Sequence, residues 1–323
     1  MLLNKFKAVF HPENFHGWNK TKRFFEIWNY KLLSFDKKSI ISIIPGMSID
    51  QNGKKQAFIQ IINGISLESE YYPFYADTFQ AHPQKFELKI GENFFSDSKI
   101  QLLHPELKAK LSFNEHIRWP SNSFSPGVMG PFSFLPCLEC YHGVLSLDHE
   151  IEGEISFLGK TYDFNGGRGF IEKDWGHSFP SSYIWMQCNH FSKKEISFIA
   201  SIAKVPFTGS YFRGFFAAIW FQEKLVQFNN YNFSKIVKCE YSNEHLILEL
   251  ENKDYKLRVE GLAGDTVPFS SPVLGFMDGR INKSLTSKLE LSLYDKRKKT
   301  IVFKDIGEPA GLETSGDLTE ICD

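Results

Sequence analysis

An internal repeat is the feature of this 323-residue chain that most restricts its fold. The segment Phe35–Ile43 (FDKKSIISI) is matched 156 residues further on by Phe191–Ile199 (FSKKEISFI). In both copies a charged turn leads into a run of β-branched and aromatic residues, which is typical of a strand. Self-similarity at a long, fixed spacing predicts copies of one structural unit. We therefore expect two related units in tandem.

Two further matches follow the same order along the chain. Phe25–Asn29 resembles Ile171–Gly176, where the second copy has one more residue between Glu and Trp, and a β-bulge would absorb that residue. The later match pairs a Pro-Phe-Ser segment, a leucine and a glycine: Pro131–Ser133, Leu138 and Gly143 with Pro268–Ser270, Leu274 and Gly279. These matches predict a first unit over residues 1–165 and a second over 166–323, ending in a frayed tail near Ser315–Asp317.

The chain reads as short alternating segments separated by turn residues. Examples are Glu154–Leu158 before Gly159, and Leu246–Leu250 before Glu251. Apolar residues rarely recur at the spacing of a helix face. We therefore predict an all-β fold of two tandem antiparallel β-barrel or sandwich units that arose by internal duplication, since closure removes exposed strand edges.

Composition and charge exclude several classes of protein. Lys and Arg total 37 against 38 Asp and Glu, so no positive field would recruit nucleic acid. The start of the sequence lacks the apolar run of a secretory signal, and no stretch approaches the ~20 apolar residues of a membrane span. We expect a cytoplasmic protein that makes at most transient contact with a membrane. Five scattered cysteines predict reduced thiols, with Cys137 and Cys140 as packing residues rather than a metal or redox pair.

Aromatic residues are unusually frequent, with 32 Phe in the chain. Aromatic side chains favour strands, and they also line pockets for apolar ligands. Trp28, Trp175 and Trp185 are accordingly candidates for a ligand-binding wall, although large aromatics in β-barrels usually belong to the core.

Four motifs together resemble the tocopherol cyclase family over nearly the whole chain. They are Arg23–Lys31 (RFFEIWNYK), Ser125–Phe132 (SPGVMGPF), Glu139–Gly143 (ECYHG) and, the most specific, Gly166–Pro180 (GGRGFIEKDWGHSFP). The resemblance implies tandem lipocalin-like barrels, an architecture shared with carotenoid hydratase-like proteins. Fold and family leave the chemistry to the site.

The resemblance also implies a reaction. In plants the family closes a chromanol ring on a prenylated hydroquinone: an alkene is protonated, and the neighbouring phenol oxygen captures the tertiary cation. Such chemistry needs a general acid, a base for the phenol proton, an apolar channel and aromatic faces near the cation, but no redox cofactor. The expected partner is thus a prenylated phenol or another isoprenoid lipid. Two alternatives are a non-catalytic, lipocalin-like carrier of such a ligand and an interaction protein that uses the repeat interface.

Carboxylates in the most specific motif are the first candidates for the acid. Glu172 and Asp174 share a parity, so an unbroken strand would present both on one face, with Lys173 and Trp175 on the other. In an apolar cavity, crowding and desolvation would raise one carboxyl pKa toward that of a general acid. Alternatively, these charges form salt bridges or cap the junction between the repeats. Arg168 is a candidate to position a phenolate or to brace the acids.

Histidines supply further candidates. His142 lies beside Glu139 and Tyr141 and could assist as acid or base, and His177 is a comparable candidate. Their alternatives are a hydrogen-bonded structural histidine and an exposed one. His142 and His149 are seven residues apart and should lie on opposite faces of a strand, so we expect no metal site. The segment Gly166–Gly169 lacks the spacing of a dinucleotide fingerprint and predicts a bend, so no cofactor is expected.

Overall fold

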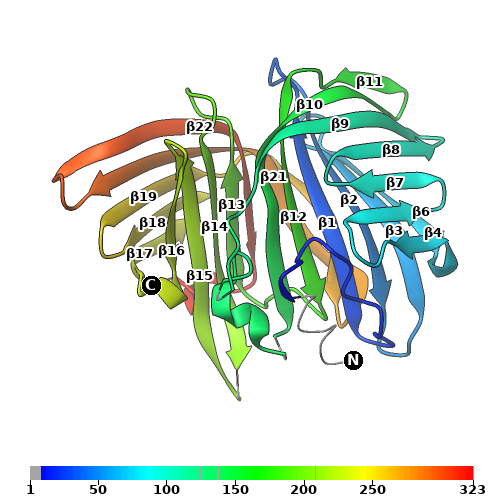
Figure 1. The fold of residues 1–323 in the computed structure, drawn as a ribbon, viewed down its shortest axis with the longest axis horizontal. Helices are drawn as coiled ribbons and strands as arrows, with labels where there is room; N and C mark the ends of the chain where they lie inside the picture. Colours follow the sequence, from blue (N-terminus) through cyan, green and yellow to red (C-terminus); the bar gives the residue numbers. More distant parts are fainter. Residues whose placement is uncertain (1–8, 124, 137, 208, 323) are drawn as a thin grey trace. The chain divides into compact units, whose positions relative to one another are not determined.

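The computed structural model describes residues 9–123, 125–136, 138–207 and 209–322, most of which lie in β-strands (Figure 1). All the strand pairings described in it are antiparallel, and they form two large sheets. The prediction of an all-β fold with two tandem antiparallel units is confirmed.

The first unit comprises the residues up to Phe179 together with Phe269–Arg280. Its sheet has the order β4-β3-β2-β1-β12-β10-β9-β8-β7-β6-β5, with β11 paired to β10. The elements are β1 (Phe24–Leu33), β2 (Ile40–Ile49), β3 (Lys55–Asn63), β4 (Glu68–Tyr75), η1 (Ala76–Thr78), β5 (Phe79–Ala81), β6 (Glu87–Ile90), β7 (Asn93–Ser96), β8 (Lys99–His104), β9 (Leu107–Ile117), η2 (Gly130–Phe134), β10 (Cys140–Phe157), β11 (Lys160–Asp163) and β12 (Gly167–Gly176).

The second unit comprises Pro180–Pro268 and the chain from Ile281 onward. Its sheet has the order β16-β15-β14-β13-β22-β21-β19-β18-β17, with β20 paired to β21. The elements are β13 (Tyr183–Cys188), β14 (Ser197–Phe207), β15 (Ser210–Phe221), β16 (Lys224–Asn229), η3 (Asn230–Asn232), β17 (Lys235–Ser242), β18 (His245–Glu251), β19 (Tyr255–Leu262), β20 (Thr266–Val273), β21 (Phe276–Asp295), β22 (Thr300–Ser315) and η4 (Leu318–Glu320).

The predicted boundary between residues 165 and 166 is wrong. β12, which begins at Gly167, lies between β1 and β10 in the first sheet, so it completes the first unit rather than opening the second. The chain passes into the second unit after Phe179. The segment Phe269–Arg280 returns to the first unit, where the Gln60 side chain bonds both the N–H and the C=O of Ser270.

The repeat is confirmed at two of its three matches. Phe35–Ile43 and Phe191–Ile199 both connect the first strand of a unit to its second. The later match leads into β10 and into β21, which occupy equivalent places beside β12 and β22. The match of Phe25–Asn29 with Ile171–Gly176 is wrong, because β1 and β12 are neighbours in one sheet. They pair in an unbroken register, so no bulge is required.

In each unit the first strand pairs with the last one, β1 with β12 and β13 with β22 (Figure 1). β9 shows the alternation of a strand with one face in the core, since Leu107, Ala109 and Leu111 are buried between exposed residues. All ten residues of β1 are buried, on both faces of the strand. The central strands can therefore hold polar side chains away from water on the face opposite the core.

The cysteines and the C-terminal segment differ from expectation. Cys239 and Cys322 form a disulfide within the second unit, so the prediction of reduced thiols is wrong for this pair. Cys140 and Cys188 take no part in a disulfide among the described residues, and Cys137 lies outside them. The expected frayed tail is also wrong, because β22 continues to Ser315 and Ile321 is buried after η4.

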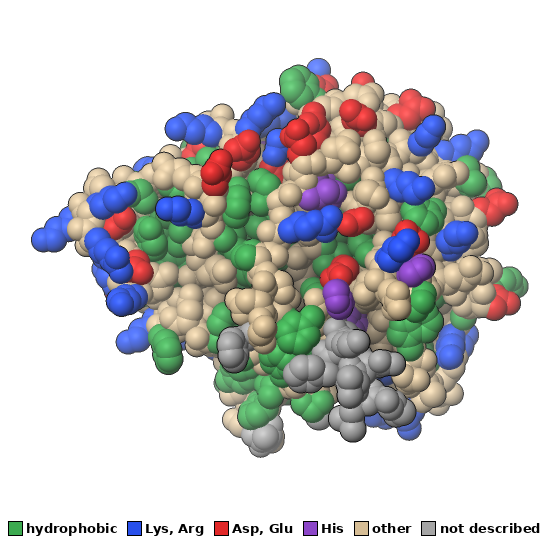
Figure 2. Space-filling model, viewed as in Figure 1, with side chains coloured by type: hydrophobic (Ala, Val, Ile, Leu, Met, Phe, Trp, Pro, Cys, Tyr) green, Lys and Arg blue, Asp and Glu red, His purple; other side chains and the backbone are tan. Residues whose placement is uncertain are grey.

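Side chains of opposite charge are interspersed on the face of the molecule shown in Figure 2. Within the described ranges, no helix is both long and apolar enough to cross a membrane.

Candidate functional site

β12 presents two chemically different faces. The side chains of Trp175 and Ile171 contact the apolar core of the first unit, and Lys173 points the same way. Glu172 and Asp174 lie on the opposite face, as their shared parity predicts. β12 is paired with β1 on one side and with β10 on the other, and these pairings fix the direction in which its side chains point.

His142 lies between the two carboxylates. The register of β10 places it directly opposite Asp174, and its Nδ1 is 2.7 Å from Asp174 Oδ1. Its Nε2 is 3.6 Å from Glu172 Oε2. All three side chains are largely buried, at 15%, 4% and 17% exposure for His142, Glu172 and Asp174. One imidazole therefore links two shielded carboxylates, an arrangement that can store and move a proton.

Asn29 and Ser42 complete the surroundings of Glu172. Asn29 lies directly across from Glu172 on β1, and its Nδ2 donates to Glu172 Oε1 over 2.7 Å. Ser42 Oγ donates in turn to Asn29 Oδ1 over 2.5 Å. Sequence analysis missed both residues, since nothing in the sequence alone shows that β1 pairs with β12. We call Glu172, His142, Asp174 and Asn29 the outer cluster.

Lys173 belongs to a separate inner cluster with Glu26 and His16. Its Nζ is 2.5 Å from Glu26 Oε1 and 2.8 Å from His16 Nδ1, and it lies 4.7 Å from the ring centres of Trp28 and Trp175. Burial lowers the pKa of Lys173 to about 8 in spite of Glu26. Burial by itself would raise the pKa of Glu26, but Lys173 and His16 together lower it. The cluster holds the N-terminal segment against β1 and β12, which is a structural role.

Tyr141 and Glu139 lie at the start of β10. Tyr141 stacks on Trp175 at 5.5 Å, and its hydroxyl donates to the carbonyl of Leu135. Glu139 Oε1 is buried and has no hydrogen-bond partner among the described residues. Burial raises the pKa of Glu139 to about 7, so this carboxyl group can release or accept a proton near neutral pH.

The other predicted site residues lie elsewhere. Arg168 forms a two-point ion pair with buried Asp148 near the beginning of β12. His177 follows the end of β12, where burial and the charges of Arg23 and Lys20 lower its pKa.

The tryptophans are likewise separated. Trp28 belongs to the core of the first unit, and its Nε1 donates to the carbonyl of Glu13. Trp185 lies on β13 of the second unit.

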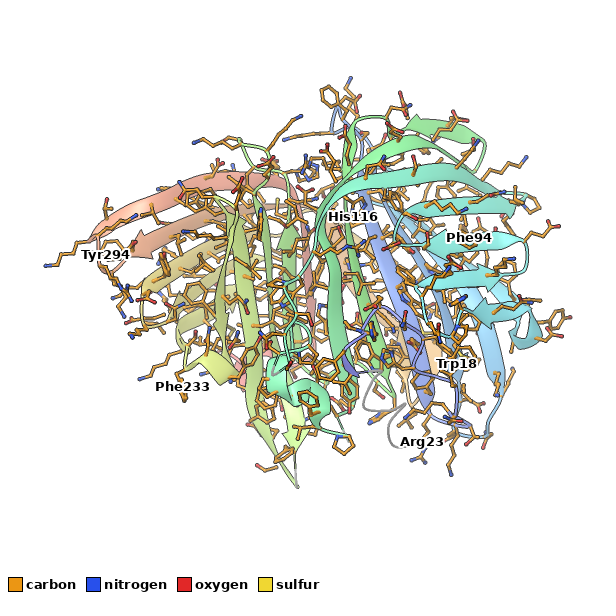
Figure 3. The ribbon with its side chains drawn as sticks, in the orientation of Figure 1. Trp18, Arg23, Phe94, His116, Phe233 and Tyr294 are labelled. Atoms are coloured by element: carbon orange, nitrogen blue, oxygen red, sulfur yellow. A yellow bond between two sulfur atoms is a disulfide. The ribbon has the colours of Figure 1, made fainter. Side chains whose placement is uncertain are left out.

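A pair of histidines, His116 and His149, lies on the core side of the first unit. The Nδ1 atoms of His116 and His149 lie 3.0 and 3.1 Å from Ser146 Oγ (His116 in Figure 3). His149 contacts the core residue Phe113, so it lies on the opposite face from His142, and this prediction is confirmed. β10 has two register shifts between His142 and His149. Because there are two of them, the two histidines still lie on opposite faces, as predicted.

The hydrogen bonds of Ser146 determine the tautomers of these histidines. Ser146 Oγ donates its proton to the carbonyl of Asp148, so both Nδ1 atoms act as donors toward it. Both Nε2 atoms are buried and have no partner among the described residues. In the described part of the chain, no group of three or more His, Cys, Asp or Glu side chains is placed to hold a metal ion.

The glycines of the Gly166–Gly169 segment have separate roles. Gly166 adopts a φ of +71°, a left-handed conformation that favours glycine at a turn, as the predicted bend requires. Gly169 lies within β12, where a Cβ atom would come 2.1 Å from His149 Nε2. This part of the motif therefore shapes the strand and its contact with His149.

Several solved structures share the fold at low sequence identity. The structure of CghA with Sch210972 has a TM-score of 0.58 and 9% identity, covering 91% of this chain and 88% of that one. A putative AttH protein from Nitrosomonas europaea has a TM-score of 0.50 and 10% identity, covering 91% and 92%. Kievitone hydratase from Nectria haematococca gives 0.49 and 12%, covering 90% and 89%. The CghA and AttH likenesses establish the fold alone.

Family membership rests on a sequence match. The model of the family described as tocopherol cyclase-like matches residues 106–316, more than half of the chain. The match spans both units and includes His142, Glu172 and Asp174. The chain therefore belongs to the tocopherol cyclase-like family.

Proposed function

We propose that this protein is an acid–base enzyme that closes a ring on a prenylated hydroquinone or a related isoprenoid phenol. The observation that carries the proposal is the position of His142, 2.7 Å from Asp174 and 3.6 Å from Glu172. Family membership supports chemistry of the cyclase type. The outer cluster supplies the proton donor and acceptor that this chemistry needs.

The proposed mechanism shares one proton between His142 Nε2 and Glu172. Asp174 accepts a hydrogen bond from His142 Nδ1 and so directs Nε2 toward Glu172. Asn29 holds the Glu172 carboxyl group from the other side. The shared proton is transferred to the trisubstituted alkene, which becomes a tertiary cation. The phenol oxygen attacks this cation, a C–O bond forms, and the phenol proton returns to the pair.

No net proton is consumed or released over one turnover. The alkene gains one proton and the phenol loses one, so product and substrate are isomers and the outer cluster returns to its starting state. Burial favours the reaction, since Glu172 is buried and water competes poorly for the cation.

Incubation of the purified protein with a prenylated hydroquinone tests the proposal. We expect a chromanol of unchanged mass by mass spectrometry, and one carbon-bound deuterium per molecule when the reaction runs in D₂O. Unchanged substrate that co-elutes with the protein would contradict ring closure and identify a carrier of isoprenoid phenols.

Substitution of Glu172 tests the role of this residue in the proposed reaction. Glu172→Gln should lower turnover by roughly 10²- to 10⁴-fold, the usual contribution of a general acid, while the circular dichroism spectrum is retained. Exposed Glu92 provides a matched control, and Glu92→Gln should keep full activity. Full activity of Glu172→Gln would remove Glu172 from the mechanism.

A further inference from the structure

The last residues of the second unit form a separate segment, residues 317–322, which we call the strap. The strap follows the end of β22 and contains the short helix η4. Gly316 turns the chain into it with a φ of +75°, and a Cβ atom at this position would collide with the carbonyl oxygen of Ser181. A side chain is therefore unfavourable at this turn, and the turn fixes the direction in which the strap leaves β22.

Polar contacts hold the strap to one side of the sheet. The Glu320 carboxylate accepts hydrogen bonds from Lys204 on β14 and from Ser182 just before β13, each at 2.5 Å. Arg213 on β15 donates from Nη1 to the carbonyl of Ile321 at 3.0 Å. These contacts come from the three consecutive strands β13, β14 and β15 and the residue that precedes them.

A covalent bond attaches the strap to the other side of the sheet. Cys322 forms the disulfide with Cys239 on β17. β17 is one end of the sheet, whereas β15 lies next to the other end. Ile321 and both cysteines belong to the apolar core of the second unit. The strap therefore connects two parts of the sheet that are far apart in its strand order, and it contributes to the core between them.

The contacts other than the disulfide hold the strap weakly. The Lys204 and Glu320 side chains are 22% and 31% exposed, and ion pairs at such positions contribute little to stability. Ordering the backbone costs conformational entropy at every residue of the strap, while Ile321 is its one buried large apolar side chain. The disulfide joins residues 83 positions apart and removes much of this cost by restricting the detached state. Attachment of the strap should therefore depend on this bond.

We propose that the Cys239–Cys322 disulfide is a redox-sensitive lock, and that a dithiol reductant releases the strap while the strands of the second unit stay folded. Release takes Ile321 out of the core and gives solvent access to Cys239 on β17. This inference does not depend on the proposed ring closure, since it involves no residue of the outer cluster.

The reduction is an ordinary thiol–disulfide exchange. Cys322 is 7% exposed and Cys239 1%, so a thiolate of the dithiol reaches the Cys322 sulfur more easily. A bond forms between these two sulfurs, and Cys239 leaves as a thiolate. The second thiol of the reductant then displaces Cys322. Two electrons and two protons pass from the dithiol to the cysteines, and the dithiol becomes a disulfide.

Hydrogen exchange measured by mass spectrometry on the full chain tests the lock. The probe is dithiothreitol, and exchange is followed during a short pulse in D₂O. In the reduced protein, the strap should exchange at least about thirtyfold faster than in the oxidised protein, which is the lower end of the effect of a disulfide. The central strand β19 should stay protected in both. Iodoacetamide, added after removal of the reductant, should label Cys239 and Cys322, and reoxidation of an unlabelled sample should restore protection.

Matched variants distinguish the lock from other effects of the reductant. Cys322→Ser should exchange at the strap without reductant as fast as the reduced wild type, and Cys140→Ala should respond as wild type does. Glu320→Gln keeps the disulfide, so its strap should stay protected until the reductant is added. If Cys322→Ser does not fold, the reduced wild type carries the test alone.

Two results would overturn the proposal. Continued protection of the strap in the reduced protein would show that core packing, and not the disulfide, holds it. Loss of protection in β19 to the same extent as in the strap would show that the second unit unfolds as a whole.

Discussion

Two glutamates of the first unit show how strongly the immediate surroundings set the pKa of one residue type. Glu26 faces Lys173 and His16, which lower its pKa against the effect of burial. Glu139 is half-buried, its buried Oε1 has no hydrogen-bond partner among the described residues, and its pKa rises to about 7. Glu26 lies within β1 and Glu139 just before β10, and their different contacts set their pKa values in opposite directions.

Glu139 should make the stability of the protein depend on pH. Its carboxyl group ionises near pH 4.5 in the unfolded chain and near 7 in the folded protein. The folded state therefore loses stability as the pH rises from 4.5 to 7 and does not recover it above 7. Glu139→Gln should be more stable than wild type at pH 8, by about 1–2 kcal/mol after allowance for solvent screening, and should have no such advantage at pH 4.5.

Urea unfolding at pH 4.5, 6 and 8 measures this difference, with Glu92→Gln as an exposed control. An advantage of Glu139→Gln that is the same at every pH would show that the Glu139 carboxyl group ionises normally in the folded protein.

Gly169 should tolerate no side chain while His149 is present. A Cβ atom at Gly169 would lie 2.1 Å from His149 Nε2, so Gly169→Ala should cost about 1–3 kcal/mol of stability. Gly127→Ala is the control, because the nearest atom to its Cβ would be 3.7 Å away. Thermal unfolding of Gly169→Ala, His149→Ala and the double variant should reveal coupling of at least about 0.5 kcal/mol. Strictly additive effects would contradict the contact.

At the scale of one element, alternate side chains of β12 have different roles, one set in the proposed catalysis and the other in stability. Glu172 and Asp174 face His142, whereas Lys173 between them faces Glu26. The parity of the two acids could be predicted from the sequence, because it needs only the period of a strand. The partners of Glu172 and Lys173 on β1 could not be, because Asn29 and Glu26 are more than 140 residues away and local patterns do not specify strand pairing.

Adjacent residues of β12 should therefore give opposite phenotypes. Lys173→Met leaves Glu26 buried without its ammonium partner and should cost about 3–5 kcal/mol of stability. Glu172→Gln keeps an oxygen to accept the Asn29 hydrogen bond, so it should cost about 1 kcal/mol while turnover falls. Urea unfolding and turnover of both variants test this division. A stable Lys173→Met protein, or a Glu172→Gln protein that unfolds first, would contradict it.

At the scale of the whole molecule, the repeat predicted two all-β units, but it did not place their boundary. The similarity of Phe25–Asn29 to Ile171–Gly176 suggested equivalent strands, whereas the two segments are partners in one sheet. Paired central strands share burial and therefore composition, and this can imitate a repeat. The disulfide could not be predicted either, because Cys239 and Cys322 are 83 residues apart and the cysteine count is odd.

The disulfide should stabilise the second unit only. Cys239 lies on β17 and Cys322 follows η4, so their bond ties the C-terminal segment to an edge strand of the sheet. Cys322→Ser should lower the stability of the second unit by about 2–4 kcal/mol. Differential scanning calorimetry with and without a reducing agent should show the same loss in wild type, whereas Cys140→Ala should respond to the reductant as wild type does. A transition that the reductant does not move would contradict this role.

The pairing of first and last strands has a consequence for how such a chain can be copied and rearranged. Phe25, near the start of β1, lies opposite Gly176 at the end of β12, and Tyr183 at the start of β13 lies opposite Ser315 at the end of β22. In each sheet the first strand thus begins beside the point where the strand paired with it ends. A gene for one unit could be duplicated in tandem and joined by a short linker without repositioning a strand. Circular permutation within either unit should, for the same reason, require only a few added residues.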